Sequence, residues 1–149
     1  MIKKISIYLF FILILFTKSL SAEEKFLSLK KDKVNVRYNP SLESEIKYIY
    51  KKINLPVKQI DQKENFRRII DLKNNSGWIH SSQLKKANSI IILEDKILFK
   101  KSSNFSRPIA RLEKERLLVI KKCENNWCNV KTGDYIGWIK AENVWGSIK

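Results

Sequence analysis

A short phrase occurs twice in this chain, 60 residues apart, and it constrains the fold more than any other feature of the sequence. Gly77-Trp78-Ile79 and Gly137-Trp138-Ile139 each follow a second aromatic residue, Phe66 in the first case and Trp127 in the second. Self-similarity at a fixed period of this size indicates two copies of one structural unit. We therefore expect two repeats that share one architecture.

The residues around the two phrases predict strands rather than helices. Short runs of β-branched and aromatic residues alternate with polar turns, as in Val34–Arg37, and no helical apolar period is sustained after the N-terminal segment. Short strands at regular spacing favour small closed barrels. We predict an all-β fold of two tandem barrels, residues 23–86 and 87–149. We expect Gly77 and Gly137 where a strand bends or where a neighbouring aromatic covers the backbone.

The first 22 residues have the layout of a secretory signal peptide. A basic start, Met1–Lys4, precedes an apolar run of 12 residues, Ile5–Phe16, and small polar residues lead to Ala22. The run is short for a membrane-spanning helix, which needs about 20 apolar residues. We predict a signal peptide over residues 1–22, with an uncleaved membrane anchor as the alternative. Membrane contact is expected only through this segment.

The charge balance is strongly positive. The chain carries 30 Lys and Arg residues against 15 Asp and Glu residues, a formal net charge of +15. Such a charge favours polyanionic partners. An exported protein rarely meets nucleic acid, so cell-wall polymer, anionic lipid head groups and acidic proteins are the better candidates. The alternative is a solvated lysine-rich surface, because the lysines are spread along the chain without a long basic block.

The only two cysteines, Cys123 and Cys128, flank a predicted hairpin turn at Glu124-Asn125-Asn126. Export to an oxidising compartment permits a disulfide across this hairpin, which would stabilise the fold by about 2 kcal/mol. A metal site fits less well, because the spacing is not that of a zinc knuckle and the single histidine, His80, lies in the other repeat. A redox pair fits less well without Cys-x-x-Cys. We expect no metal and no cofactor.

The order of these motifs resembles the bacterial SH3-like (SH3b) family. The opening Val34-Asn35-Val36-Arg37 with Pro40 and the closing Gly77-Trp78 carry the resemblance, although Asn39 stands where the family usually has glycine. The second repeat lacks the opening, so we interpret it as a degenerate copy. The whole chain resembles a two-repeat periplasmic subgroup with a Cys-x-x-x-Trp-Cys hairpin and a late Trp-Gly. The framework that the resemblance implies comprises Val34, Asn35, Val36, Pro40, Phe66, Gly77, Trp78, Trp127, Gly137 and Trp138.

The resemblance implies a non-catalytic binding protein of the periplasm. Family members often bind cell-wall peptidoglycan or peptides, and the alternative is an adaptor that docks on an envelope enzyme or transporter. The candidate ligand-binding residues are Arg37, Tyr38, Tyr48, Tyr50, Arg67 and Arg68. Phe66 and Trp78 fit either an aromatic groove or the core. Arg37 fits either a ligand carboxylate or a structural ion pair.

No catalytic constellation is visible in the sequence. A catalytic histidine needs a nucleophile or a metal beside it, and none lies near His80. The sequence also contains no Gly-x-Ser-x-Gly, no histidine-rich cluster and no phosphate-binding glycine loop. We predict that the chain is not an enzyme. Ligand specificity is expected in what the two copies do not share, the Arg37–Pro40 turn of the first and the disulfide hairpin of the second.

Overall fold

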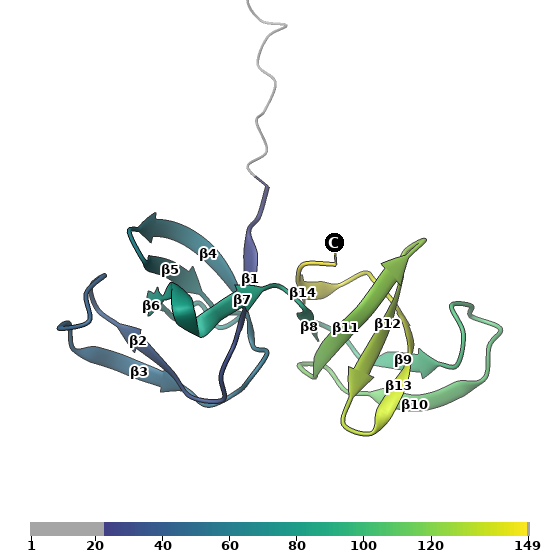
Figure 1. Ribbon diagram of the computed structural model, residues 1–149. Helices are drawn as coiled ribbons and strands as arrows, with labels where there is room; N and C mark the ends of the chain where they lie inside the picture. Colours follow the sequence, from purple (N-terminus) through teal and green to yellow (C-terminus); the bar gives the residue numbers. More distant parts are fainter. Residues whose placement is uncertain (1–22, 149) are drawn as a thin grey trace, which may run out of the picture.

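The computed structural model describes residues 23–148, and the predicted signal peptide lies outside them. The described residues form two seven-stranded antiparallel sheets, each curled into a small barrel (Figure 1). The first barrel contains β1 (Phe26–Leu29), β2 (Val34–Arg37), β3 (Ile46–Tyr50), β4 (Pro56–Lys63), β5 (Phe66–Ile70), β6 (Ser76–His80), the 3₁₀ helix η1 (Ser81–Gln83) and β7 (Leu84–Lys86). The second contains β8 (Ser89–Ile92), β9 (Lys96–Phe99), β10 (Pro108–Leu112), β11 (Leu117–Glu124), β12 (Trp127–Thr132), β13 (Tyr135–Lys140) and β14 (Val144–Gly146).

The two barrels have the same strand order. The first runs β3-β2-β6-β5-β4-β1-β7, and the second runs β10-β9-β13-β12-β11-β8-β14. Each strand of one barrel therefore has a counterpart in the other, and the all-β tandem-repeat prediction is confirmed. Among residues 23–148, no helix has the length and apolar character needed to cross a membrane.

Each barrel encloses its own hydrophobic core, built by the period of two that governs strands. In β2, Val34 and Val36 are fully buried while Asn35 and Arg37 point outward. The core of the first barrel consists of Leu29, Val34, Val36, Val57, Ile69, Ile79 and Leu84. That of the second consists of Ile90, Ile92, Leu98, Leu112, Leu118, Cys128, Val130 and Ile139.

The two repeated glycines lie where strands cross closely. A Cβ on Gly77 would lie 2.4 Å from Val36 Cγ1 and 3.0 Å from the Arg37 carbonyl oxygen. On Gly137 it would lie 2.6 Å from the Phe99 carbonyl oxygen. The nearest obstacles are thus the backbone and aliphatic side chains of the facing strand, rather than an aromatic ring. Only a residue without a side chain permits this approach.

The central hairpins extend further than the sequence pattern predicts. The last apolar residue of β4 is Ile60, but the strand continues to Lys63, and the turn is Glu64–Asn65. Likewise β11 continues past Ile120 to Glu124. Both strands carry a register shift at the matching position, between Gln59 and Asp61 and between Ile120 and Lys122. Because the ends beyond these bulges are mostly exposed, the apolar alternation that marks a strand is lost there.

The predicted disulfide is present. Cys123 and Cys128 are directly opposed on β11 and β12, their Cα atoms lie 4.1 Å apart, and a disulfide joins them. The turn between the strands is Asn125–Asn126, with φ angles of 49° and 64°. Two successive left-handed residues define a type I′ turn, which suits asparagine. The bridge therefore closes a hairpin whose turn the sequence already favours.

The barrels contact each other through β1, β4, β8 and β14, near the centre of Figure 1. The hydroxyls of Ser28 and Ser89, both fully buried, lie 2.8 Å apart. The Trp145 indole nitrogen donates to the Pro56 carbonyl oxygen at 3.2 Å, and the ring packs edge-on against Phe26 at 5.1 Å. The two serine hydroxyls and the indole are thus paired across the junction, whereas the buried side-chain oxygen of Asn88 has no hydrogen-bond partner among the described residues.

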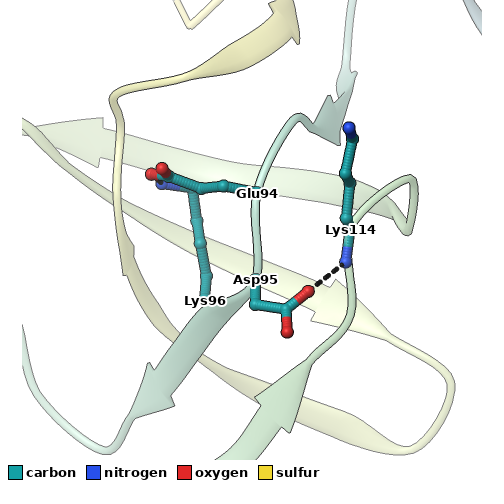
Figure 2. Close-up of polar contacts among 4 residues, drawn as sticks. All are labelled: Glu94, Asp95, Lys96 and Lys114. Atoms are coloured by element: carbon teal, nitrogen blue, oxygen red, sulfur yellow. Dashed lines mark hydrogen bonds and ion pairs between the residues drawn. The ribbon is translucent and has the colours of Figure 1, made fainter.

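A buried lysine opens β9. Lys96 takes the position that Val34 holds in the first barrel, and its ammonium lies 2.9 Å from the Glu94 carboxylate. In Figure 2, Asp95 accepts a hydrogen bond from the Lys114 backbone N–H, at 2.9 Å. Asp95 also pairs with Arg111. Two hydrogen bonds lower the pKa of Glu94. The bond from Lys96 has the larger effect, and the bond from the Asn143 side chain has the smaller one. The pKa of Asp95 is lowered most by the hydrogen bond from the Lys114 N–H and, to a smaller extent, by the hydrogen bond from Arg111.

These contacts predict acid sensitivity in the second barrel. Both carboxyls have a lower pKa in the folded than in the unfolded chain, where ordinary values are 4.5 for Glu and 3.8 for Asp. Their stabilisation is therefore complete above the unfolded values and is lost as the pH falls through the folded values. Urea unfolding between about pH 6 and about pH 2 should show a fall in the free energy of unfolding. Asp95→Asn should make this fall in the free energy of unfolding smaller, because the variant has lost one of the two carboxyls.

The control for this acid series is Asp134→Asn. It removes a carboxylate from the exposed β12–β13 turn, where Asp134 makes no side-chain hydrogen bond or ion pair with any other described residue. This variant should keep the wild-type pH dependence. Equal flattening by both substitutions would contradict the role given to Asp95.

Candidate functional site

Cationic and aromatic side chains converge on a shallow cleft of about 230 Å³ on the outer face of the first barrel. Its residues come from the end of β2, the loop that follows β2, and strands β3, β5 and β6. We call it the basic cleft, and it is lined by Arg37, Tyr38, Lys47, Arg68, Ser76, Gly77 and Trp78.

The centre of the basic cleft is a row of three side chains on adjacent strands. Trp78 is the register partner of Arg37 on one side and of Arg68 on the other. Directly opposed residues of antiparallel strands project from the same face, so the indole stands between two guanidinium groups. Trp78 is half-buried and Arg68 is exposed. The outward face of β6 therefore presents an aromatic surface flanked by two permanent positive charges.

Hydrogen bonds within the barrel hold two of the cations in place. One Arg37 guanidinium nitrogen donates to the Ser44 carbonyl oxygen at 2.5 Å, which ties the loop after β2 to the strand. The Lys47 ammonium donates to the Ser76 carbonyl oxygen at 2.9 Å and lies 5.7 Å from the centre of the Tyr38 ring. Arg68 makes no such bond with the described residues. Two cations are thus positioned in advance, and the third is free to engage a ligand.

The positive charge of the cleft is not neutralised internally. Asp61 lies opposite Arg68 in register, but its carboxylate accepts the Gln62 N–H at 2.7 Å. Within residues 23–148, neither Arg37 nor Arg68 has a carboxylate at ion-pair distance. Guanidinium groups bind carboxylates in a two-pronged geometry and stack on aromatic rings. The arrangement is suited to an anionic, extended ligand.

Three of the six predicted ligand residues lie in the basic cleft and three do not. Arg37, Tyr38 and Arg68 line it. Arg67 turns the other way, and its guanidinium donates to the carbonyl oxygens of Glu64 and Phe66, both at 2.9 Å. Tyr48 and Tyr50 pack against the core of the first barrel. Of the two aromatics with open roles, Phe66 is buried and Trp78 lines the cleft.

Tyr48 and Tyr50, both half-buried, form a polar group with the buried Asp71. The Tyr50 hydroxyl donates to the Asp71 carboxylate at 2.9 Å and lies 3.3 Å from the Tyr48 hydroxyl. Burial raises the pKa of both tyrosines, and for Tyr50 the hydrogen bonds to Tyr48 and Asp71 raise it further. Asp71 also accepts N–H groups from Lys73 and Asn75, so it organises the β5–β6 turn. This group therefore supports the first barrel from the inside.

Lys47 is a cleft residue that the sequence reasoning missed. It lies between Ile46 and Tyr48 on β3, and adjacent residues of a strand point to opposite faces. Once Tyr48 and Tyr50 are assigned to the core, alternation alone assigns Lys47 to the outer face. The alternation was visible in the sequence, but the prediction placed Tyr48 and Tyr50, rather than Lys47, on the ligand-binding face.

The second barrel repeats the loop after β2 despite its different sequence. In both barrels a serine hydroxyl accepts a backbone N–H across the loop: Ser44 from Asn39 at 3.0 Å, and Ser106 from Lys101 at 2.8 Å. The Ser41 and Ser103 hydroxyls accept equivalent N–H groups. The shared signal is Ser-x-x-Ser, at residues 41–44 and 103–106, which a search for Asn-Val-Arg does not detect. The second copy therefore keeps the opening geometry without the opening motif.

The outer face of the second barrel lacks the cations of the basic cleft at the equivalent positions, and a different cation, the Lys122 ammonium, lies 5.1 Å from the centre of the Trp138 ring. The residues that correspond to Arg37, Lys47, Arg68 and Ser76 are Phe99, Ile109, Asn129 and Ile136, arranged around Trp138. Ile109 and Ile136 are 38% and 47% exposed. The same position on the fold is thus basic in one barrel and largely apolar in the other.

His80 has a structural role. Its Nδ1 accepts the Ser82 backbone N–H at 3.3 Å and lies 2.8 Å from the Ser82 hydroxyl, capping η1. Its ring packs edge-on against Phe66 at 5.1 Å. Across residues 23–148, no group of three or more His, Cys, Asp or Glu side chains could hold a metal ion.

Comparison with known proteins identifies a family. The sequence model of the bacterial SH3 domain matches the chain twice, at residues 30–86 and 98–146, and no catalytic domain was found. No curated protein matches the sequence. Two solved structures, NlpC2 and NlpC1 from Trichomonas vaginalis, align with TM-scores of 0.38 and 0.39 and identities of 14% and 13%. The alignments cover 82% and 88% of this chain but 48% and 49% of those proteins. The chain thus spans about half their length, and a likeness at this level says nothing of its function.

Proposed function

This chain belongs to the bacterial SH3 domain family, and we propose that it is a non-catalytic binding protein that engages cell-wall peptidoglycan through the basic cleft of the first barrel. The observation that carries the proposal is the Arg37–Trp78–Arg68 row, because no internal carboxylate neutralises its charge. Peptidoglycan stem peptides are short, extended and carry carboxylates, so they match this row in charge.

The mode of binding follows from the placement of the side chains. Arg68, exposed and without an internal partner, takes a stem-peptide carboxylate. Trp78 and Tyr38 provide flat surfaces for the peptide backbone and its methyl groups. Arg37 holds the loop by its bond to Ser44 and adds positive charge. A hydrogen bond between the charged Arg68 guanidinium and a ligand carboxylate contributes about 1.5–3 kcal/mol, or roughly 10- to 100-fold in affinity.

Export to the periplasm is part of the same proposal. The Cys123–Cys128 disulfide is consistent with an oxidising compartment. The predicted signal peptide over residues 1–22 would take the chain there.

Retention on purified sacculi tests the proposed function. Arg68→Glu should lower retention at low salt at least about tenfold. The substitution replaces the free guanidinium of the cleft with a negative charge, which repels the carboxylates of the ligand. The matched control is Lys131→Glu, which makes the same change in net charge at an exposed position of β12. It should keep most of the binding. Co-sedimentation with quantified bound protein gives both values.

Two outcomes would contradict the cell-wall proposal. The first is no retention of the wild-type protein on sacculi at low salt. The second is an equal loss in Arg68→Glu and Lys131→Glu, which would mean that the overall charge of the protein, rather than the cleft, attracts the wall.

A second candidate function is an adaptor between proteins, and the apolar outer face of the second barrel favours it. Phe99, Ile109 and Ile136 replace polar side chains of the first barrel there, and apolar surfaces of this kind often dock other proteins. The adaptor would bind an envelope enzyme or transporter through this face. Cross-linking in cells followed by mass spectrometry would then identify one stable partner, linked through β10 or β13.

A further inference from the structure

The disulfide hairpin borders a second, larger cavity, of about 540 Å³, on the second barrel. We call it the amide cavity, and its main lining residues are Asn104, Asn125, Asn126, Trp127, Lys140 and Glu142. They come from the loop between β9 and β10, the β11–β12 turn and the end of β13. Cavities of about 300–1,000 Å³ are the usual size of small-molecule sites.

Hydrogen-bonding groups without partners converge on this cavity. Within residues 23–148, no hydrogen bond or ion pair engages the side-chain amides of Asn104, Asn125 and Asn126. The same holds for the Lys140 ammonium and the Glu142 carboxylate. Each amide can donate two hydrogen bonds and accept two. The cavity therefore offers many hydrogen-bond donors and acceptors. The positive charge of Lys140 and the negative charge of Glu142 give it no net charge.

The backbone that carries Asn125 and Asn126 is held in place before any ligand arrives. The Cys123–Cys128 disulfide closes the hairpin immediately behind the turn. Asn125 and Asn126 adopt left-handed conformations that asparagine tolerates, and the Asn126 carbonyl oxygen accepts the Ala141 N–H at 2.9 Å. A site ordered in advance loses less conformational entropy on binding.

An aromatic ring forms one wall of the amide cavity, and the first barrel shows how such a ring can be covered. Trp127 is half-buried and packs edge-on against Phe99 at 5.8 Å. Its counterpart Phe66 is only 6% exposed, with the His80 ring 5.1 Å away. Lys140 stands in place of His80 in the second barrel. The indole therefore borders a cavity, where the phenyl ring is enclosed.

We propose that the amide cavity is a binding site for neutral saccharides that carry acetamido groups. Amide side chains match hydroxyl and acetamido groups in both donor and acceptor capacity, and an indole stacks against the C–H face of a sugar ring. The balanced charge disfavours the anionic ligand that suits the basic cleft. The site is separate from that cleft, so the inference does not rest on the proposed function.

Titration of the ¹⁵N-labelled protein with triacetylchitotriose, a neutral oligosaccharide of N-acetylglucosamine, tests the inference by NMR. The side-chain amide signals of Asn104, Asn125 and Asn126 and the Trp127 indole N–H should shift together and saturate. Asn104→Ala, in an exposed loop, should raise the dissociation constant about fivefold or more, the effect of about one lost hydrogen bond. Asn126→Asp, which keeps the backbone preference of asparagine, should also weaken binding.

The first barrel offers matched controls for both substitutions. Leu42 and Asn65 hold the positions equivalent to Asn104 and Asn126, so Leu42→Ala and Asn65→Asp should leave the affinity for the saccharide unchanged. Arg68→Glu should do the same, which separates this site from the basic cleft. No shift at millimolar saccharide would overturn the inference. It would also be overturned if Asn104→Ala left the shift changes and the dissociation constant as in the wild type. The same holds if the signals of these four residues responded only to an acidic peptide.

Discussion

Gly137→Ala is expected to lower the free energy of unfolding of the second barrel by about 3 kcal/mol, at the upper end of the cost of overpacking a core. The added methyl would lie 2.6 Å from the Phe99 carbonyl oxygen, 2.8 Å from Leu98 Cγ and 3.1 Å from Ile109 Cδ1. A backbone oxygen cannot move aside by rotating about a side-chain bond. Strands β13 and β9 must therefore separate, which loosens the barrel at the crossing that closes it.

Urea unfolding followed by tryptophan fluorescence measures this loss, since Trp127, Trp138 and Trp145 all lie in the second barrel. Gly133→Ala is the matched control. A Cβ there meets nothing within 4 Å, so the substitution carries only the strain of a left-handed backbone at φ 55°, about 1 kcal/mol. If Gly137→Ala cost no more than Gly133→Ala, the close approach of the two strands would not be the reason for the repeated glycine.

Trp145→Ala is expected to uncouple the two barrels. The substitution removes the edge-on contact with Phe26 and leaves the Pro56 carbonyl oxygen without the indole donor. Truncating a buried tryptophan costs about 3–5 kcal/mol, and Trp145 is half-buried, so we expect about 3 kcal/mol. The loss falls largely on the junction between the barrels, because both partners of Trp145 belong to the first barrel.

¹⁵N relaxation detects the uncoupling directly. The wild-type protein should tumble as one body, and the two barrels of Trp145→Ala should tumble faster and with different correlation times. Trp145→Phe keeps a ring beside Phe26 but loses the hydrogen bond to Pro56, so its effect should be intermediate. Unchanged relaxation in Trp145→Ala would mean that the paired hydroxyls of Ser28 and Ser89 hold the barrels together without it.

Local patterns predicted the elements best where each strand has one buried face. Val34 and Val36 point inward as their alternation indicates, and Cys123 and Cys128 flank an Asn-Asn turn of the expected kind. The pattern failed where strands project into solvent beyond a bulge, as at Lys63 and Glu124, because no apolar alternation remains there.

The composition of the candidate sites was harder to predict than the strands. Tyr48 and Tyr50 are aromatic residues of the kind that line binding grooves, but they pack against the core, where Tyr50 hydrogen-bonds with Asp71 and Tyr48 pairs with Tyr50. Lys96 lies at a core-facing position, where a lone lysine would be costly, because Glu94 pairs with it. The partner of Tyr50 is 21 residues away, and the partner of Lys96 is two residues away but is brought to the ammonium by the fold of the turn before β9. Apolar alternation encodes neither pairing.

The sequence by itself determined that this chain folds as two antiparallel barrels of one family, with a disulfide across a hairpin of the second. Those features depend on alternation, turn residues and spacing, which are local along the chain. Only the tertiary structure decided that Arg37, Trp78 and Arg68 stand in one row, that the second barrel replaces the two arginines of this row with uncharged side chains, and that unpaired amides meet beside Trp127. Such neighbours come from strand register and loop packing, which bring together residues far apart in the sequence.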